Sequence, residues 1–279
     1  MTMLSINTNV GALQAARSSY SVNKSMEQSM ERLASGKRIN SASDDAAGLA
    51  IANRLNAEIN GIHQAVRNAS DAQGMLGVAE GALEQVHALL LRMRELAVQS
   101  ANETVTSADR NMLQTEVAQL ETEIQRIVDD TTWAGITLLA GGFTTGATFQ
   151  IGPRNSDTIQ ISISAIEPLS TVADGGLNLN NHVSTQDNAG TYIGVIDGAI
   201  SIISADRATY GAVMNRLDHA MANLQNVATN LSVAKGRIED ADFATESSNL
   251  ARTQVLQQAS MAMLAQANAS KQNILSLFQ

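Results

Sequence analysis

The side chains that could carry chemistry in this chain are few and widely separated. The 279 residues include four histidines and no cysteine, so thiolate nucleophiles, thiolate metal sites and disulfides are excluded. No two histidines stand in an HExxH arrangement, which argues against a zinc hydrolase. Neither a GxxxxGKS/T loop nor a GxGxxG turn after a strand occurs, so no phosphate-binding motif is found. We therefore predict no catalytic, cofactor-binding or metal-binding residue.

A pair of carboxylates next to a serine is a concentrated polar group in the N-terminal half. Asp44 and Asp45 could hold a metal ion between them, and they directly follow Ser43. An apolar pattern typical of a helix begins just after them, where Ser43 can accept a hydrogen bond from a free backbone N–H. Two carboxylates there also meet the positive end of the helix dipole. We interpret these residues as a helix start, with Ser43 as the cap.

Net charge and hydropathy argue against two further classes of function. The chain carries 18 Lys and Arg against 27 Asp and Glu, a net charge of −9, and this acidic balance argues against non-specific nucleic-acid binding. No apolar run approaches the ~18 residues that indicate a membrane span. The first basic side chain is Arg17, so a cleaved secretory signal is not expected. The protein is therefore either cytoplasmic or exported by a route that uses no such signal.

Helical periodicity dominates the chain on both sides of a central segment. The strongest pattern repeats apolar residues every three or four positions over residues 49–97. It predicts a long helix buried along one side, as in a coiled-coil-like bundle. Similar seams at residues 113–127 and 192–231 predict two further helices, and we expect Gly236 to interrupt the second of these.

The two ends of the chain are also predicted to be helices, but neither can satisfy its apolar surface alone. The first, at residues 4–33, has a weak stripe that would be marginal in water without a partner. The last, from residue 240 or 242 to the C-terminus, is apolar over roughly 200° of its circumference. We expect the terminal helices to pair and their remaining apolar face to meet other copies of the chain. The stripe of the first helix comprises Leu13, Ala16, Tyr20, Asn23, Met26, Met30 and Leu33.

A short β-region separates the helical halves. Residues 148–151 and 158–163 alternate polar and apolar side chains around a turn-rich segment, which predicts a β-hairpin. Residues 165–190 indicate irregular surface structure. The predicted fold class is mainly α: a long coiled-coil-like helical bundle with a β-hairpin and with paired N- and C-terminal helices.

Several long, ordered motifs at both ends of the chain resemble those of bacterial flagellin. The resemblance covers about residues 1–165 and 190–279, and its most specific stretch is LASGKRINSASDDAAGLAI at residues 33–51. The other matching motifs are SINTN at 5–9, RELAVQSAN at 94–102, FQIG at 149–152, RIEDADFA at 237–244, LQQA at 256–259, LAQAN at 264–268 and QNILSL at 272–277.

The resemblance implies a structural subunit that self-assembles into the bacterial flagellar filament used for motility. It implies that residues 1–40 and 240–279 pair as terminal helices and line the inner tube of the filament. Residues 41–140 and 190–239 would form the long-helix bundle of the outer tube. Residues 141–189 would hold the β-hairpin and a short irregular segment in place of the variable outer domains that flagellins usually carry.

The resemblance also implies how such a subunit reaches the filament. Flagellins travel unfolded through a type III-type export channel and polymerise at the filament tip, which accounts for a chain with no signal peptide and no cysteine. The expected partners are other copies of the chain in a helical homopolymer, the hook–filament junction and cap proteins, and the flagellar export apparatus with its chaperone. No nucleic acid, membrane or cofactor is expected, and the expected location is the secreted, extracellular filament.

Two groups of residues follow as predicted binding sites. Some flagellins are sensed by a host Toll-like receptor through the long helices; the matching positions are Arg92, Leu96 and Glu116, which we expect to form one exposed patch. A neighbouring position that is usually Gln in the family is Leu91 here, which departs from the receptor pattern. The predicted filament interface comprises Leu13, Tyr20, Leu264, Leu275, Leu277 and Phe278.

Three other interpretations compete with the filament subunit. A junction protein that joins hook to filament resembles flagellin at both termini, but it usually carries a distinct middle domain and weaker matches near residues 33–51. An enzyme on a helical scaffold is a second alternative, and it lacks any candidate site. A cytoplasmic coiled-coil scaffold is the third, and it leaves the hairpin and the matched termini unexplained.

Overall fold

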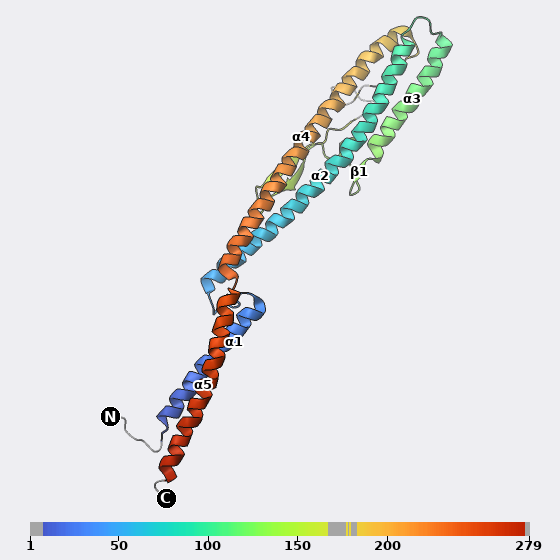
Figure 1. Cartoon of the computed structure of the whole chain (residues 1–279). Helices are drawn as coiled ribbons and strands as arrows, with labels where there is room; N and C mark the ends of the chain where they lie inside the picture. Colours follow the sequence, from blue (N-terminus) through green and yellow to red (C-terminus); the bar gives the residue numbers. More distant parts are fainter. Residues whose placement is uncertain (1–7, 167–176, 178, 180–182, 277–279) are drawn as a thin grey trace. The chain divides into compact units, whose positions relative to one another are not determined.

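The chain is mainly helical and divides into two compact units. The structure, a computed structural model, describes residues 8–166, 177, 179 and 183–276, with side chains up to residue 270. The terminal unit combines both ends of the chain, Met1–Ile59 and Thr229–Gln279, and the central unit consists of Asn60–Ala228. Figure 1 labels the helices of both units.

Three helices run along the central unit (Figure 1). They are α2 (Ala46–Ser100), α3 (Ser107–Asp130) and α4 (Gln186–Glu239), of which α2 and α4 each give most of their length to this unit. Polar contacts join them in pairs. Arg207 on α4 lies 2.7 Å from Glu80 on α2, and the Tyr192 hydroxyl on α4 donates to Glu121 on α3 at 2.9 Å.

Large apolar side chains form the core of the central unit. The predicted seam of α2 is confirmed here, because its members from Ala69 to Ala97 are nearly all fully buried. Such a core stabilises a fold by roughly 1.5–3 kcal/mol for each large side chain removed from water. The fully buried residues include Leu76, Leu83, Leu90 and Met93 on α2, Val117 and Ile124 on α3, and Tyr192, Ile196 and Ile203 on α4.

The start of α2 differs from the prediction in its capping residue. The Gly48 N–H donates to Asp45 Oδ1 at 2.8 Å, so Asp45 rather than Ser43 caps the helix. Ser43 instead shares a 2.7 Å hydroxyl contact with Ser41 inside the preceding turn. Asp44 closes that turn by accepting from the Ser41 N–H at 3.0 Å. Backbone N–H donors at Ser41 and Asn40 lower the pKa of Asp44, because they favour the charged carboxylate.

The turn between α2 and α3 is fixed from both sides. Thr106 and Asp109 form a reciprocal capping box at the start of α3, in which each side chain satisfies a backbone N–H of the other residue. Arg110 then reaches back and donates to the carbonyl oxygens of Ser100 and Asn102, at 2.9 and 3.0 Å. Ser100 is the last residue of α2 and Asn102 lies just beyond it, so Arg110 satisfies carbonyl groups at the C-terminal end of α2. The same turn begins α3.

The predicted β-hairpin is confirmed. Strands β3 (Ala147–Gln150) and β4 (Thr158–Ile161) pair antiparallel, with Ala147 opposite Ile161. Ile159 and Ile161 point into the core of the central unit, which follows the predicted alternation of polar and apolar residues.

A second, smaller hairpin was not predicted. Strands β1 (Thr132–Trp133) and β2 (Ile136–Thr137) pair antiparallel and lead into the short helical turn η1 (Leu138–Gly142), whose two leucines are buried. Strands of two residues are too short to show any periodicity, so the sequence pattern could not indicate them.

Helix ends differ from several predicted boundaries. Within the described residues the first helix, α1 (Val10–Ser35), begins at Val10 because Asn9 caps it. α4 begins at Gln186 rather than at residue 192, and it runs through Gly236 to Glu239 without the predicted interruption. A single interior glycine costs only about 1 kcal/mol, which a long packed helix absorbs. α5 (Phe243–Ser276) starts after Asp242, as predicted.

Candidate assembly surface on the terminal helices

The terminal helices α1 and α5 pack against each other along the terminal unit (Figure 1). The side that α1 buries in this pairing mixes small, polar and apolar residues. Ser19 and Ser29 are the most buried of its described side chains, at 9% and 6% exposed. Residues on this side are spaced by alternating steps of three and four, as in a coiled coil. The positions that follow this spacing are Ala12, Ala15, Ser19, Val22, Met26, Ser29 and Leu33, and Asn23 and Arg32 beside them are also half-buried.

α5 presents a seam of the same character. Its buried side chains are polar: Glu246 is 7% exposed and Thr253 is 9% exposed. Steps of four and three again relate the members, so one continuous face of the helix packs on α1. Among the described side chains, the positions that follow this spacing are Glu246, Leu250, Thr253, Gln257, Ser260, Leu264 and Ala267, and Ser247 and Asn249 are also half-buried.

Three polar contacts tie the two helices together along their length. Near the chain ends, Asn9 Nδ2 donates to the Ala267 carbonyl at 3.2 Å. In the middle, Gln257 Nε2 donates to Asn23 Oδ1 at 2.9 Å. At the other end, Arg32 Nη1 lies 2.9 Å from Glu246 Oε1. We refer to the Asn23–Gln257 and Arg32–Glu246 contacts as the two polar ties.

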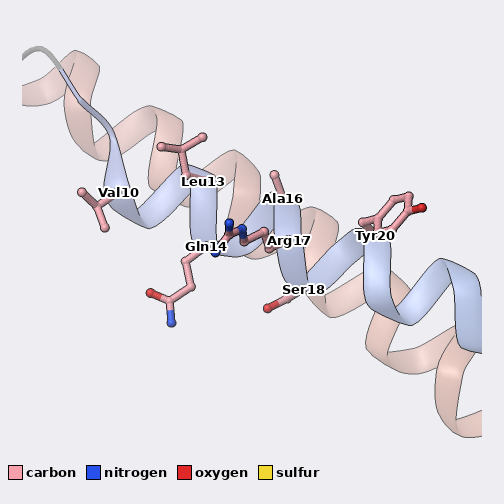
Figure 2. Close-up of a pocket in the computed structure, with 7 residues that line it drawn as sticks. All are labelled: Val10, Leu13, Gln14, Ala16, Arg17, Ser18 and Tyr20. Atoms are coloured by element: carbon pink, nitrogen blue, oxygen red, sulfur yellow. The ribbon is translucent and has the colours of Figure 1, made fainter.

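The large apolar side chains of the terminal helices point away from the seam. Leu13 is 60% exposed and Tyr20 is 75% exposed, and both rise from the same side of α1 (Figure 2). Together with Val10 and Ala16 they line a shallow groove. On α5, large side chains are also exposed. Among the described side chains, the exposed large apolar residues of α5 are Phe243, Val255, Leu256, Met261 and Met263.

This arrangement corrects one part of the predicted pattern. Leu13, Tyr20 and Met30 of the predicted apolar stripe of α1 are exposed. Asn23, Met26 and Leu33 of the same stripe are half-buried and lie on the side that packs on α5. The stripe is therefore only partly the packing face. Leu264, a predicted interface residue, is half-buried within the α5 seam. The side chain of Leu275 and the residues Leu277 and Phe278, also predicted for the interface, lie outside the described residues.

A short group of contacts, which we call the clasp, joins the segment after α1 to the segment before α5. The Arg38 N–H donates to the Glu239 carbonyl at 2.6 Å, and the Ala241 N–H donates to the Gly36 carbonyl at 2.9 Å. The Glu239 side chain, in a residue that is 7% exposed, lies 2.5 Å from Lys37 Nζ and 3.7 Å from Lys235 Nζ. The hydrogen bond from Lys37 holds the pKa of Glu239 below its ordinary value, because it favours the charged carboxylate.

The predicted receptor residues occupy two different environments. Arg92 and Glu116 are exposed and form an ion pair of 2.8 Å that joins α2 to α3. Leu96, however, is only 1% exposed, so the predicted patch of three exposed residues is wrong at this position. Leu96 follows the buried Met93 by three residues on α2. It therefore lies on nearly the same face of the helix and points into the core. The exposed leucine is Leu91, at 44%.

Neither metal-ligand geometry nor a membrane segment is found in the described residues. Within them, no group of three His, Asp or Glu side chains is arranged to hold a metal ion. Among the described helices, none combines the length and the apolar character needed to cross a membrane. The described residues do carry a group of exposed large apolar side chains on α1 and α5.

The fold and this surface define a class of protein: a long-helix protein whose two terminal helices expose large apolar side chains. Comparison with known proteins gives the family. Residues 6–144 match the bacterial flagellin N-terminal helical region, and residues 193–278 match the bacterial flagellin C-terminal helical region. The chain belongs to the bacterial flagellin family.

Individual relatives agree with this result. The chain is 41% identical to the flagellin of Halalkalibacterium halodurans over 98% of its own length and 99% of the relative's. It is 36% identical to the flagellin of Bacillus subtilis, with the same coverage of both chains. The crystal structure of Bacillus cereus flagellin is 32% identical, with a TM-score of 0.50 over 61% of this chain and 94% of that one. The protein is thus a structural subunit of the flagellar filament, used for motility, and it lacks the variable outer domain.

Proposed function

We propose that the paired helices α1 and α5 form the inner tube of the filament, and that the long helices of the central unit form the outer tube around it. In this assignment residues 1–40 and 240–279 line the inner tube, residues 41–140 and 190–239 form the outer tube, and residues 141–189 replace the variable domains. The observation that carries the proposal is the exposure of large apolar side chains on α1 and α5, such as Tyr20 at 75%.

Energetics support burial of this surface between subunits. A large apolar side chain left in water forgoes roughly 1.5–3 kcal/mol, and Leu13, Tyr20 and Val255 are each at least 60% exposed in the single chain. These residues lie outside the seam through which α1 pairs with α5, so that pairing does not bury them. Neighbouring copies in the inner tube bury them.

The route to the filament fits the same proposal. We propose export in an unfolded state through the flagellar export apparatus with its chaperone, followed by polymerisation at the tip of the extracellular filament under a cap protein. The first subunits would join the hook–filament junction proteins. A chain without cysteine forms no disulfide that would have to open before export, which supports passage in an unfolded form.

The test compares the full chain with a chain trimmed to residues 41–239, and with chains trimmed at one end only. Each protein is seeded with filament fragments and followed by electron microscopy and sedimentation, while circular dichroism reports its helix content. We expect the full chain to elongate the seeds and the doubly trimmed chain to stay monomeric and helical, because its packed core lies in the central unit. Filaments grown from the doubly trimmed chain would refute the assignment.

A host receptor is a second proposed partner, supported by the exposed ion pair between Arg92 and Glu116. We propose that a Toll-like receptor contacts this pair on the free subunit. Arg92→Ala should weaken activation of receptor-bearing cells and leave the helix content unchanged. Arg126→Ala, which removes another exposed arginine with ion pairs on α3, is the matched control. Equal activation by Arg92→Ala and the parent at every dose would exclude the contact.

A further inference from the structure

The outward side of α1 carries a second regular set of residues, separate from the seam that packs on α5. Its members follow alternating steps of four and three residues, so they share one face along most of the helix. Every one of them is exposed in the single chain, and Figure 2 labels three of them, Leu13, Arg17 and Tyr20. We call this set the outer stripe: Leu13, Arg17, Tyr20, Lys24, Glu27, Glu31 and Ala34.

Charge is divided unevenly along the outer stripe. Arg17 and Lys24 make its first half basic, whereas Glu27 and Glu31 make its second half acidic. In the part of the chain that the structure describes, none of these four side chains takes part in an ion pair. The two halves of the stripe therefore present charges of opposite sign to any surface that approaches this side of α1.

Arg17 lies between two large apolar residues of the stripe. Leu13 precedes it by four positions and Tyr20 follows it by three, and all three line the same shallow groove. A surface that covers the two apolar side chains also removes the guanidinium from water, and a charge without water requires a partner of opposite sign. Burial of this groove in the filament thus demands a carboxylate on the covering chain.

Few carboxylates on the terminal helices can meet that demand. The sequences of α1 and α5 contain three acidic residues, Glu27, Glu31 and Glu246. Glu246 is buried and already bound to Arg32 of its own chain in one of the polar ties. Glu27 and Glu31 are exposed and lie on the outer stripe itself. A neighbour that covers the groove with a terminal helix therefore has to offer Arg17 the acidic half of its own outer stripe.

Axial displacement decides which charges meet when two copies of α1 lie parallel. Without displacement Arg17 faces its own counterpart, and a shift by one repeat of the stripe brings Arg17 against Lys24, so both arrangements oppose like charges. A shift by two repeats, about 21 Å at 1.5 Å per residue, brings Arg17 to the level of Glu31. It also brings Tyr20 to the level of Ala34, so the aromatic ring meets a small apolar side chain.

We propose that the outer stripes of neighbouring subunits pack in parallel with a displacement of two repeats, so that Arg17 of one subunit pairs with Glu31 of the next. The inference rests on the proposed place of α1 in the inner tube. Such a contact joins different patches of two copies. It leaves an unused acidic half on the first copy and an unused basic half on the second, so further copies can add and the polymer stays open. An antiparallel contact would join the same patch twice and close into a dimer.

Charge reversal in the full-length chain tests the pair. Arg17→Glu and Glu31→Arg each turn an attraction into a repulsion, so each should raise the critical concentration for seeded growth about tenfold. Arg17→Glu combined with Glu31→Arg should return it to within about threefold of the parent. Sedimentation measures the critical concentration, and circular dichroism checks that the helix content is unchanged. The matched controls Arg216→Glu and Glu103→Arg reverse exposed charges of the central unit and should grow like the parent.

A mixture of the two single variants separates this contact from a defect within each chain. In an equimolar mixture the introduced glutamate of one variant meets the introduced arginine of the other. Growth should therefore recover toward that of the parent, although neither variant grows well alone. Misfolding of either variant would persist in the mixture, so recovery reports a contact between chains.

Several results would contradict the inference. Growth of both single variants at the level of the controls would overturn it, as would a mixture that grows no better than its components. Dimers of the parent that form without seeds in sedimentation velocity would also overturn it, because they indicate the antiparallel contact. The trimmed chains test the inner-tube assignment separately. If the doubly trimmed chain stays monomeric while the reversal variants grow normally, the assignment stands and only the pairing of Arg17 with Glu31 is wrong.

Discussion

The two units of the chain differ in what their helices bury. The central unit encloses large apolar residues such as Leu83, Leu90 and Tyr192, none of them measurably exposed. In the terminal unit, Ile39 is buried beyond the end of α1, but α1 and α5 themselves bury Ser19 and Thr253 and leave large apolar side chains exposed. The difference supports our proposal that the terminal helices gain stability from neighbouring chains.

The largest effect on the free chain is expected from a cavity in the central core. Leu90→Ala removes a fully buried side chain and should lower the free energy of unfolding by about 2–5 kcal/mol. The neighbouring Leu91 is 44% exposed, so Leu91→Ala should change it by no more than about 0.5 kcal/mol. Urea unfolding followed by circular dichroism measures both. Similar losses in the two variants would mean that α2 does not bury the face described here.

The response to acid should also differ between the units. Lys37 holds the pKa of Glu239 in the clasp below its ordinary value, so its stabilising contribution is present above the ordinary pKa and is lost as the pH falls through the folded-state pKa. Glu239→Gln should therefore cost about 1 kcal/mol near neutral pH, the value of a typical hydrogen bond, and almost nothing at about pH 3. Thermal unfolding at several pH values gives the comparison.

Asp206 in the central unit should respond in the opposite sense. Burial raises its pKa, and its Oδ2 atom is buried with no partner among the described residues. A raised folded-state pKa contributes stability below the ordinary pKa that is lost as the pH rises. Asp206→Asn should thus stabilise the chain near neutral pH and converge with the parent in acid. If Asp206→Asn instead destabilises at neutral pH, the carboxylate has a favourable partner.

The core of the central unit was largely predictable from sequence, because its apolar residues repeat at short, regular intervals along each helix. Apolar residues at steps of three and four, from Leu76 to Met93, bury the same face whichever helix packs on it. Alternation in residues 158–163 likewise predicted the hairpin strand β4. The β1–β2 hairpin could not be predicted, since two-residue strands carry no periodic signal.

The orientation of α1 could not be predicted by the same rule. Of its predicted stripe, Leu13 and Tyr20 are exposed, whereas Met26 and Leu33 are half-buried against α5. The contacts that decide this orientation come from residues more than two hundred positions away, as Gln257 is from Asn23. In the proposed filament, a rule that places apolar residues inside would hold only when the surfaces of other chains are counted. The capping of α2 by Asp45 rather than Ser43 is a smaller case, decided by a turn geometry that composition does not reveal.

The smallest effect on the free chain, and the sharpest contrast with Leu90→Ala, is expected from Tyr20→Ser. Tyr20 is 75% exposed and points away from the seam (Figure 2), so the free energy of unfolding of the monomer should change by no more than about 0.5 kcal/mol.

In the proposed inner tube the same ring is buried, and the variant then loses roughly 1.5–3 kcal/mol of contact free energy in each subunit. That loss corresponds to at least a tenfold rise in critical concentration. Calorimetry of the monomer and seeded polymerisation measure the two quantities separately. A fall in monomer stability that matches the loss in the filament would place Tyr20 in the core of its own subunit and remove the contrast between the units.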